Sequence, residues 1–509
     1  MLHSAKDVNI LRAKIRPMTD VSLSFEVHQP LRLNKNFFWD RHILREAVPG
    51  SLFDFYFDDA ENKRIFDRIS DKCYLPANKV IFDCIKRFEE SDRPFKVAYS
   101  FSGVFLEQCR KYRPQVLESF QKLVETEKVE VLEQTYYHSL ASLYEEKAEF
   151  CDQVRMHREL IWDIFGKKPT TFENTELIYS DEVAKLADGL GYKAIFTEGV
   201  VSDPNHVYRP KGTNLALLLR NYQLTDDIGF RFSSRFWEEY PLTAKKYATW
   251  LAATPGQCIN IFCDYETFGE HQWEETGIFE FLRYLPEEVL KQENLRFATP
   301  SEIARDISPQ SELSVESYIS WADLERDTSC WLGNALQQAC FMYQKRLEAP
   351  VKESQDADLL DIWRILGLSD HLYYIFTHGG GPGEVHSYFS PYGTPYDAAV
   401  AYFSVLADLH YRLKKNLKIA DEQFKFAKGI DDFTGVVAWS LVGLKKALAE
   451  VDADSLEYHN TKGDLAKWAK TSLGEEELAR ELEKLKDIKG ERLRKALLQA
   501  VDAALKVGC

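Results

Sequence analysis

Over its first 300 residues the chain alternates short apolar runs with longer segments in which apolar residues recur at helical spacing. The apolar runs are rich in β-branched and aromatic residues and are bounded by polar or glycine-bearing turns, a pattern typical of buried strands. Seven to eight strands are predicted, at 21–27, 96–100, 130–134, 170–176, 194–199, 215–220, 259–262 and 295–299. The alternation of strand and helix predicts an α/β fold with a parallel sheet.

The strand signal ends near residue 300. Helical spacing at 301–306, 331–347, 357–368 and 396–413 predicts a helical bundle that packs against the sheet and completes its cleft. A glycine-rich segment at 378–384 lacks the ending of a phosphate loop and is predicted to be a connection. Residues 425–432 are predicted to be a polar connection, and 455–509 to be charged helices. We therefore divide the chain into an α/β domain at 1–300, a helical bundle at 301–415 and a helical accessory module at 416–509.

Two of the predicted strands end in carboxylates. The strand at 259–262 leads into Asp264, and the strand at 170–176 ends at Glu176, which period-two alternation places on the opposite face from Glu173. At the edge of a parallel sheet an acid desolvated by aromatic neighbours has a raised pKa and can donate a proton. Two such carboxyl groups are typical of glycoside hydrolysis, where one protonates the leaving oxygen and the other attacks or activates water.

The residues alone leave other acids open. Glu266 shares the face of Asp264 at period two, so it could be the proton donor instead. Asp226 and Asp227 lie in a polar segment at 221–232, where they could belong to the site or be solvated turn residues.

Five segments in order resemble the sequence regions of glycoside hydrolase family 57, α-amylase type. They are HQP at 28–30, EVLEQTYYHSL at 130–140, NTEL at 174–177, DYETFGEH at 264–271 and WLGN at 331–334. A single His-Gln-Pro would be weak evidence, but five regions in series are specific. The resemblance covers roughly residues 20–400 and fades after about 415.

The resemblance implies an incomplete TIM-like barrel of seven β/α units, (β/α)7, followed by a helical bundle. It implies a retaining mechanism on α-glucans, with Glu176 as nucleophile, Asp264 as acid/base and a supporting role for Glu266. Retaining geometry predicts that the two catalytic carboxyl groups lie about 5 to 5.5 Å apart. The candidate substrate contacts are His28, Glu130, His138, Asp226, Glu266, His271, Trp273 and Trp331.

We therefore expect a retaining glycoside hydrolase that cleaves α-1,4-glucosidic bonds in starch, glycogen or maltooligosaccharides. Hydrolysis and transfer use the same catalytic residues, so a 4-α-glucanotransferase is one alternative, and α-1,6 activity is a lesser one. A non-catalytic amylase-like glucan-binding protein is another, although the presence of Glu176 and Asp264 argues against it. A deacetylase on a related barrel would need a metal-binding set of Asp and His residues that the sequence does not show. Neither a metal nor a cofactor is expected.

Charge and cysteine usage narrow the partners and the location. The net charge of −16 argues against binding to nucleic acids or anionic membranes, which attract basic surfaces. No apolar run approaches the 18 or so residues of a membrane span, and residues 1–20 lack the apolar core of a signal peptide. The nine cysteines are scattered without a C-x-x-C pair, which is typical of reduced thiols and predicts a cytoplasmic protein. The sequence is also compatible with a homo-oligomer.

Overall fold

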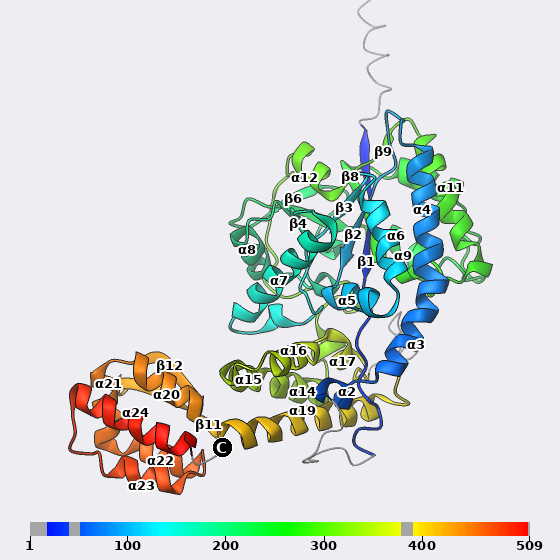
Figure 1. Cartoon of the computed structure of the whole chain (residues 1–509). Helices are drawn as coiled ribbons and strands as arrows, with labels where there is room; N and C mark the ends of the chain where they lie inside the picture. The colour runs from blue at the N-terminus through cyan, green and yellow to red at the C-terminus, as the bar shows by residue number, and fades with distance from the viewer. Residues whose placement is uncertain (1–17, 40–50, 378–389, 507–509) are drawn as a thin grey trace, which may run out of the picture. The chain divides into compact units, whose positions relative to one another are not determined.

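Most runs predicted as strands form one sheet in the computed structural model, which describes residues 18–39, 51–377 and 390–506 (Figure 1). The segments 1–17 and 378–384 lie outside the described residues. The chain divides into two units. One comprises Met1–Arg32, Phe57–Gln337 and Gly367–Pro395, and the other comprises Leu33–Tyr56, Gln338–Leu366 and Tyr396–Cys509.

Within the described residues, the sheet of the first unit has ten strands. They are β1 (Thr19–Val27), β2 (Val97–Phe101), β3 (Val129–Val131), β4 (Thr171–Phe172), β5 (Ala194–Glu198), β6 (Val207–Pro210), β7 (Ala216–Arg220), β8 (Cys258–Asp264), β9 (Leu295–Phe297) and β10 (Glu312–Leu313). β1 pairs in parallel with β2, β8 and β9, β2 pairs with β3, and β5 pairs with β4 and β7. β7 also pairs in parallel with β8, and a parallel bridge between Glu133 and Phe172 joins the chain after β3 to β4. The predicted parallel sheet is confirmed, while the short strands β6 and β10 have no counterpart in the sequence analysis.

Helices follow most of the parallel strands. In the first unit they are α3 (Asp59–Ile69), α4 (Leu75–Arg87), α5 (Gly103–Tyr112), α6 (Pro114–Val124), α7 (Ala148–Phe165), α8 (Asp181–Gly189), α9 (Tyr222–Gly229), α10 (Ala244–Ala253), α11 (Ile278–Leu290), α12 (Pro300–Asp306), α13 (Ser329–Leu332) and α17 (Ser369–Tyr373), while α14 (Ala335–Arg346) continues into the second unit. Their ends follow local chemistry. Ser102 caps α5 by accepting a hydrogen bond from the Phe105 amide, and α7 ends at Gly166 in the left-handed conformation.

Alternation along the strands decides which side chains reach the site. On β1 the odd-numbered residues within 21–27 pack with the helices in the main core, so Glu26 lies on the opposite face, and His28 continues its row. That opposite face carries a second, smaller core, to which Phe262 of β8 belongs, and we call it the inner face. Asp264 follows Phe262 in the same row. Parallel pairing of β1 with β8 places Glu26 opposite Asp264 in register, so polar groups gather where these strands end.

The second unit is mainly helical. Its helices are α2 (Leu52–Tyr56), α15 (Glu348–Ser354), α16 (Ala357–Ile365), α19 (Pro395–Leu417), α20 (Leu441–Glu450), α21 (Ala453–Lys462), α22 (Asp464–Thr471), α23 (Glu476–Glu483) and α24 (Gly490–Lys506). None of the helices in the described part of the chain is long and apolar enough to cross a membrane.

The second unit also contains a hairpin where the sequence analysis expected only helices and a polar connection. Strands β11 (Ile419–Gly429) and β12 (Asp432–Ser440) pair antiparallel. Phe424 and Phe426 are buried in a core shared with α20 to α24, while Gln423 and Lys425, which alternate with them, are polar. One buried face is enough to fix a strand in a hairpin, but it gives a weaker apolar signal than a strand buried on both faces.

Candidate active site

One pocket collects side chains from distant parts of the first unit. Glu176, Asp264, His271, Trp321 and Tyr373 are among its lining residues. The structure therefore brings both predicted catalytic carboxyl groups and the predicted contact His271 into one place. The cavity volume is about 90 Å³.

Glu176 reaches this pocket from a tight turn. β4 is only two residues long, and the chain then turns so that Glu176 has φ 58° and ψ 28°, while Leu177 has φ 51°. Such left-handed conformations cost about 1–3 kcal/mol at each non-glycine residue, so neighbouring groups must hold them. The hydroxyl of Ser320 does so by donating to the Glu176 carbonyl oxygen at 2.7 Å.

This turn overrides the alternation expected for the segment. The carboxylate of Glu173 accepts a hydrogen bond from Ser100 at 2.9 Å, and Ser100 belongs to the inner-face row of β2. Phe172 packs instead against Phe150 of α7, on the helical side of the sheet. Glu173 is therefore the inward residue of the strand, and Glu176 enters the pocket through the turn because the chain has left the extended conformation.

Two side chains hold the carboxylate of Glu176. The indole Nε1 of Trp321 donates to Oε2 at 2.5 Å, and Nε2 of His138 lies 3.4 Å from Oε1. On its other side, Nδ1 of His138 lies 3.1 Å from Oε1 of Gln134 and 3.2 Å from Oε1 of Glu26. Burial lowers the pKa of His138, but the hydrogen bond to Glu176 and the nearby carboxylates outweigh it, so this pKa is raised overall. A protonated His138 donates from both nitrogens and stabilises the ionised form of Glu176.

Asp264 has a different environment. Burial raises its pKa to about 7, and the charge of Glu176 acts in the same direction, whereas Arg220 and His138 oppose the rise. At neutral pH the protonated and ionised forms of Asp264 are therefore both populated, while Glu176 is held by hydrogen-bond donors. Two carboxyl groups whose surroundings differ in this way are the arrangement that separates an acid from a nucleophile.

His28 stacks on His138, with ring centroids 4.0 Å apart. Burial lowers the pKa of His28 to about 4, so its ring is neutral at pH 7. Its Nδ1 lies 2.7 Å from the hydroxyl of Ser102, which donates to it, and its Nε2 donates to Oδ2 of Asp370 at 2.9 Å. Burial would raise the pKa of Asp370, but His28 and other histidines lower it to about 2, so the acceptor is ionised. His28 is thereby fixed in one tautomer.

Three further buried carboxyl groups lie close to the pair. Burial raises the pKa of Glu26 well above its usual range, and the neighbouring carboxylates add to the rise. Burial likewise raises the pKa of Glu173 to about 8 and that of Glu266 to about 8. Glu266 accepts a hydrogen bond from Tyr74 and does not line the pocket. Clustered acids with raised pKa values are a feature of functional sites.

Other reactive groups of the pocket are neutral. Burial raises the pKa of Cys263 to about 12, so this thiol is protonated at pH 7 and is a poor nucleophile. Burial lowers the pKa of His271 to about 4. Within the described ranges, no three His, Cys, Asp or Glu side chains gather as a metal site would require.

Of the eight predicted substrate contacts, only His271 lines the pocket, and Glu130 and Trp273 are two of those outside the lining. Glu130 is at the other end of the inner face, where its carboxylate oxygens accept hydrogen bonds from Thr171 Oγ1 at 2.7 Å and from the Ser301 amide at 2.8 Å. Through these two hydrogen bonds Glu130 links β3 to β4 and to the start of α12, which is a structural role. Trp273 is 52% exposed, and Lys72 Nζ lies 5.7 Å from the centroid of one of its rings.

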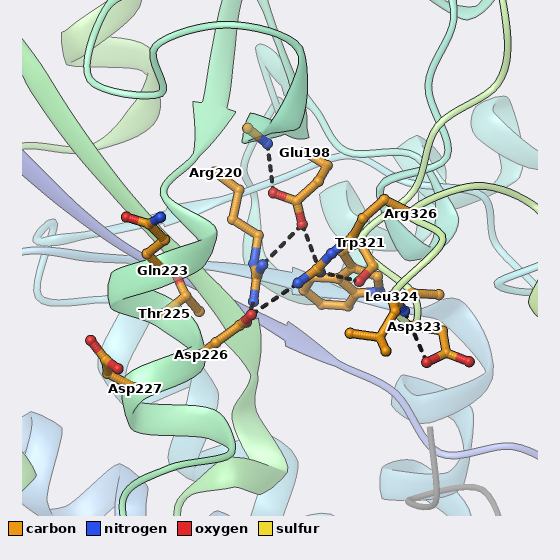
Figure 2. A network of polar contacts seen from close by, with 12 residues as sticks. Glu198, Arg220, Gln223, Thr225, Asp226, Asp227, Trp321, Asp323, Leu324 and Arg326 are labelled. Atoms are coloured by element: carbon orange, nitrogen blue, oxygen red, sulfur yellow. Dashed lines mark hydrogen bonds and ion pairs between the residues drawn. The ribbon is translucent and has the colours of Figure 1, made fainter. Parts of the chain in front are cut away.

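Asp226 and Asp227 separate onto two sides of a helix, as Figure 2 shows. The segment expected to be a polar turn is α9, which begins because Asn221 accepts a hydrogen bond from the Leu224 amide at 3.1 Å. Asp226 binds two arginines with its two oxygens, and Asp227 pairs with Arg231 at 2.6 Å. Neither carboxylate lines the pocket.

Trp331 is fully buried and stacks on Tyr373, with ring centroids 6.2 Å apart. It was expected to reach the cleft, but it supports the pocket from behind, because Tyr373 stands between them as a lining residue. Trp321, ten positions earlier, is the tryptophan that contacts Glu176.

Sequence reasoning did not select Glu26, Arg220, Trp321 or Asp370 as site residues. Glu26 had a usable signal, since it shares the row of His28 on β1. Trp321 and Asp370 had none, because their contacts join residues 145 and 342 positions apart.

Comparisons with known proteins identify the family of the chain. The profile of Glycosyl hydrolase family 57 matches residues 22–316. A protein of Methanocaldococcus jannaschii named "Putative alpha-amylase" is 45% identical over 413 residues, which cover 78% of this chain and 85% of that protein.

Two solved structures share the fold at 15% sequence identity. The 4-α-glucanotransferase of Thermococcus litoralis has a TM-score of 0.56 over 83% of this chain, which spans 63% of that protein. The family 57 branching enzyme of Thermococcus kodakaraensis has a TM-score of 0.55 over 78% of this chain and 90% of its own. The resemblance of the five sequence regions is confirmed: the chain belongs to glycosyl hydrolase family 57, a family of glycoside hydrolases.

Proposed function

We propose that this protein is a retaining glycoside hydrolase that cleaves α-1,4-glucosidic bonds in α-glucans by double displacement. The observation that carries the proposal is the placement of Glu176 and Asp264 in one pocket with different electrostatic surroundings. The choice of α-glucans is supported by the amylase name of the 45% identical relative and by the α-amylase-type sequence at 264–271.

In the first step the Glu176 carboxylate attacks the anomeric carbon of the bound sugar. The bond from that carbon to the glycosidic oxygen breaks, and Asp264 gives its proton to the departing oxygen. Trp321 and His138 hold the two oxygens of Glu176, which limits the reorientation needed for attack.

In the second step Asp264 is a carboxylate and acts as the base. It takes a proton from water, the oxygen attacks the anomeric carbon, and the bond to Glu176 breaks, which restores both groups to their first state. A sugar hydroxyl in place of water gives transfer to another glucan with the same residues. Hydrolase and 4-α-glucanotransferase therefore differ in the acceptor alone.

Substrate entry requires the pocket to open. Its cavity volume of about 90 Å³ is below the roughly 300 Å³ at which small-molecule sites usually begin. Phe230, which is partly exposed, and Asp323 are among the lining residues, and we expect these side chains to move when a sugar ring enters.

We also propose that the sheet is an incomplete (β/α)7 barrel and that the protein is cytoplasmic. Strand pairings run from β1 through β2 and β3, across the bridge to β4, then through β5, β7 and β8 back to β1, which supports an incomplete (β/α)7 barrel. The eight cysteines in the described part of the chain are free thiols, which supports a reducing, cytoplasmic setting.

The test compares the wild type with Glu176→Gln on maltoheptaose, with products resolved by chain length. We expect shorter maltooligosaccharides and new reducing ends from the wild type, and a loss of at least about 1,000-fold in the variant. Glu130→Gln is the matched control, because it changes a buried glutamate at the other end of the inner face and is expected to keep activity within about threefold.

Product stereochemistry supplies the second measurement. A retaining enzyme forms the α-anomer first, which proton nuclear magnetic resonance (NMR) detects before mutarotation. First formation of the β-anomer would contradict the retaining assignment. A ladder of longer chains without new reducing ends would identify a glucanotransferase, and no turnover on several α-glucans would favour the non-catalytic glucan-binding protein.

A further inference from the structure

A closed ring of ion pairs joins three buried residues, Glu198, Arg220 and Asp226, to the partly buried Arg326 (Figure 2), and Arg220 also lines the pocket. Arg220 binds Glu198 at 2.9 Å and Asp226 at 2.7 Å, and Arg326 binds the same two carboxylates at 3.1 and 2.9 Å. Arg220 has a further hydrogen bond outside these ion pairs, because its Nε donates to the carbonyl oxygen of Phe262 at 2.8 Å. Two cations alternate with two anions, so the ring has no net charge. It ties β5, β7 and α9 to the loop that carries Arg326.

The ring fixes Trp321 from several directions. Arg326 donates to the backbone carbonyl of Trp321. The guanidinium carbon of Arg220 lies 5.6 Å from the centroid of the Trp321 ring, and Phe262 packs against that ring edge-on with centroids 5.6 Å apart. The position of the indole N–H is therefore set by its own ring contacts and by the ion pairs that hold its backbone.

The same loop donates three hydrogen bonds to Glu176. Trp321 donates its indole N–H to Oε2, and both the Ser320 hydroxyl and the Trp321 backbone N–H donate to the carbonyl oxygen of Glu176. Glu176 has a left-handed backbone conformation that an isolated glutamate would rarely adopt. A loop that is anchored at Arg326 therefore fixes both the backbone and one carboxylate oxygen of Glu176.

We propose that the ring Glu198–Arg220–Asp226–Arg326 is a positioning device that aims the Glu176 carboxylate through Trp321. The inference rests on the proposed function for the role of Glu176 as nucleophile. None of the four ring residues attacks the substrate or transfers the proton; Arg326 acts through the Trp321 carbonyl, and Trp321 acts through its indole N–H.

Stability alone gives a weak reason for such a ring. Desolvation of buried ions offsets much of their attraction, and apolar packing of similar volume is often as stable. The ring supplies directed hydrogen bonds, including one to the Trp321 carbonyl, which apolar side chains could not make. Small displacements of a reacting group can lower a rate by about 100-fold, so a fixed Trp321 has a kinetic consequence.

The kinetic test is a double-mutant cycle between Arg326→Gln and Trp321→Phe. We expect Arg326→Gln to lower kcat on maltoheptaose by about 10- to 100-fold with KM changed less than about threefold. If Arg326 acts through the indole N–H, adding Arg326→Gln to Trp321→Phe lowers kcat by less than about twofold further. Equal effects in both backgrounds, or a change confined to KM, would overturn the proposal.

Two controls separate positioning from folding. Arg231→Gln removes the ion pair with Asp227, which lies on the other side of α9 from Asp226 (Figure 2), and we expect it to leave kcat unchanged. Arg326→Lys keeps the charge but not the forked geometry, so we expect a folded protein, checked by thermal unfolding, with the same loss in kcat. If Arg326→Gln fails to fold, the cycle is run with Arg326→Lys.

An NMR measurement is independent of activity. Among the indole N–H resonances of the ten tryptophans, the one absent from Trp321→Phe belongs to Trp321. We expect Glu176→Gln and Arg326→Gln to shift it and Arg231→Gln to leave it in place. An indole resonance unmoved by Arg326→Gln would overturn the proposal. If the shifts occur while the wild type shows no turnover, the proposed function fails and the positioning contact stands.

Discussion

The two ends of the inner face both bury carboxylates, but they treat them differently. At the start of β1, Asp20 pairs with Arg296 of β9, and Glu130 accepts hydrogen bonds from Thr171 and Ser301. At the end of β1, Glu26 faces a group of other carboxyl groups. Each acid at the first end has its own donor, whereas the acids at the second end have one another as neighbours.

The cause of each raised pKa shows what this difference means. Burial raises the pKa of Glu130, and the hydrogen bonds that it accepts oppose the rise. Burial also raises the pKa of Glu26, and there the charges of Glu173, Glu176, Asp264 and Glu266 add to it. Burial of an acid alone therefore does not identify a site. Several buried acids that repel one another are a stronger indication of a functional site. Such repulsion destabilises the fold, and a purely structural role would not require it.

The largest expected effect belongs to Asp264, the proposed acid/base at the end of the inner face that carries Glu26. Its pKa is about 7 and it must be protonated to assist departure, so kcat/KM on maltoheptaose should fall as pH rises through about 7. Asp264→Asn should lower kcat by about 100- to 10,000-fold and remove this alkaline limb. Glu130→Gln should keep the limb at the same pH. These profiles are measured from initial rates between pH 4 and 9.

A substrate with a good leaving group sharpens the same comparison. Fluoride departs without a proton, so α-maltosyl fluoride should restore the first step in Asp264→Asn but not in Glu176→Gln. An alkaline limb that persists in Asp264→Asn would assign the proton to another acid, and Glu266 would be the first to examine because its pKa is about 8.

A smaller effect concerns stability. The pKa of Glu173 is raised by burial from 4.5 to about 8, so the folded state holds this proton where the unfolded state has lost it. The free energy of unfolding should therefore fall as pH rises from about 4.5 to 8, by up to about 1.4 kcal/mol per pH unit for this group. Glu173→Gln cannot ionise and should remove that part of the slope. Urea unfolding at pH 5, 6.5 and 8 measures it.

At the other end of the inner face, Glu130→Gln should change the free energy of unfolding in the opposite direction. Glu130→Gln replaces an acceptor of two hydrogen bonds, and we expect it to lower the free energy of unfolding by about 1 kcal/mol at pH 8. At that pH Glu173→Gln should be more stable than the wild type. If the free energy of unfolding falls equally with pH in Glu173→Gln and in the wild type, then the fold does not raise the pKa of Glu173.

The parts of the molecule that sequence could predict are those with local signals. The parallel strands were predictable because both of their faces are buried, which produces continuous apolar runs. Asp264 was predictable as the polar residue that ends such a run. The hairpin β11–β12 was not predicted, because charged residues interrupt β11 and glycine and partly exposed positions weaken the apolar pattern of β12.

The missing parts of the site depend on contacts that a local pattern cannot encode. The left-handed turn at Glu176 breaks the two-residue period on which its predicted direction rested. Trp321 and Asp370 come from loops and a short helix far along the chain, and only the folded structure brings them to Glu176 and His28. Asp226 was a reasonable candidate by type, but its two oxygens bind arginines.

The smallest expected effect asks whether the site extends beyond the inner face. Trp273 follows the pocket-lining residue His271 in sequence and is 52% exposed, so Trp273→Ala should leave the melting temperature unchanged. If its ring stacks on a sugar of a longer chain, a loss of about 0.5–1.5 kcal/mol raises KM for maltoheptaose by roughly 2- to 10-fold at constant kcat. The KM for a nitrophenyl maltoside, which has only two sugar rings, should not change if the contact is with a more distant sugar. An equal rise in KM for both substrates would place Trp273 next to the scissile bond. An unchanged KM for both would show that Trp273 does not bind the substrate.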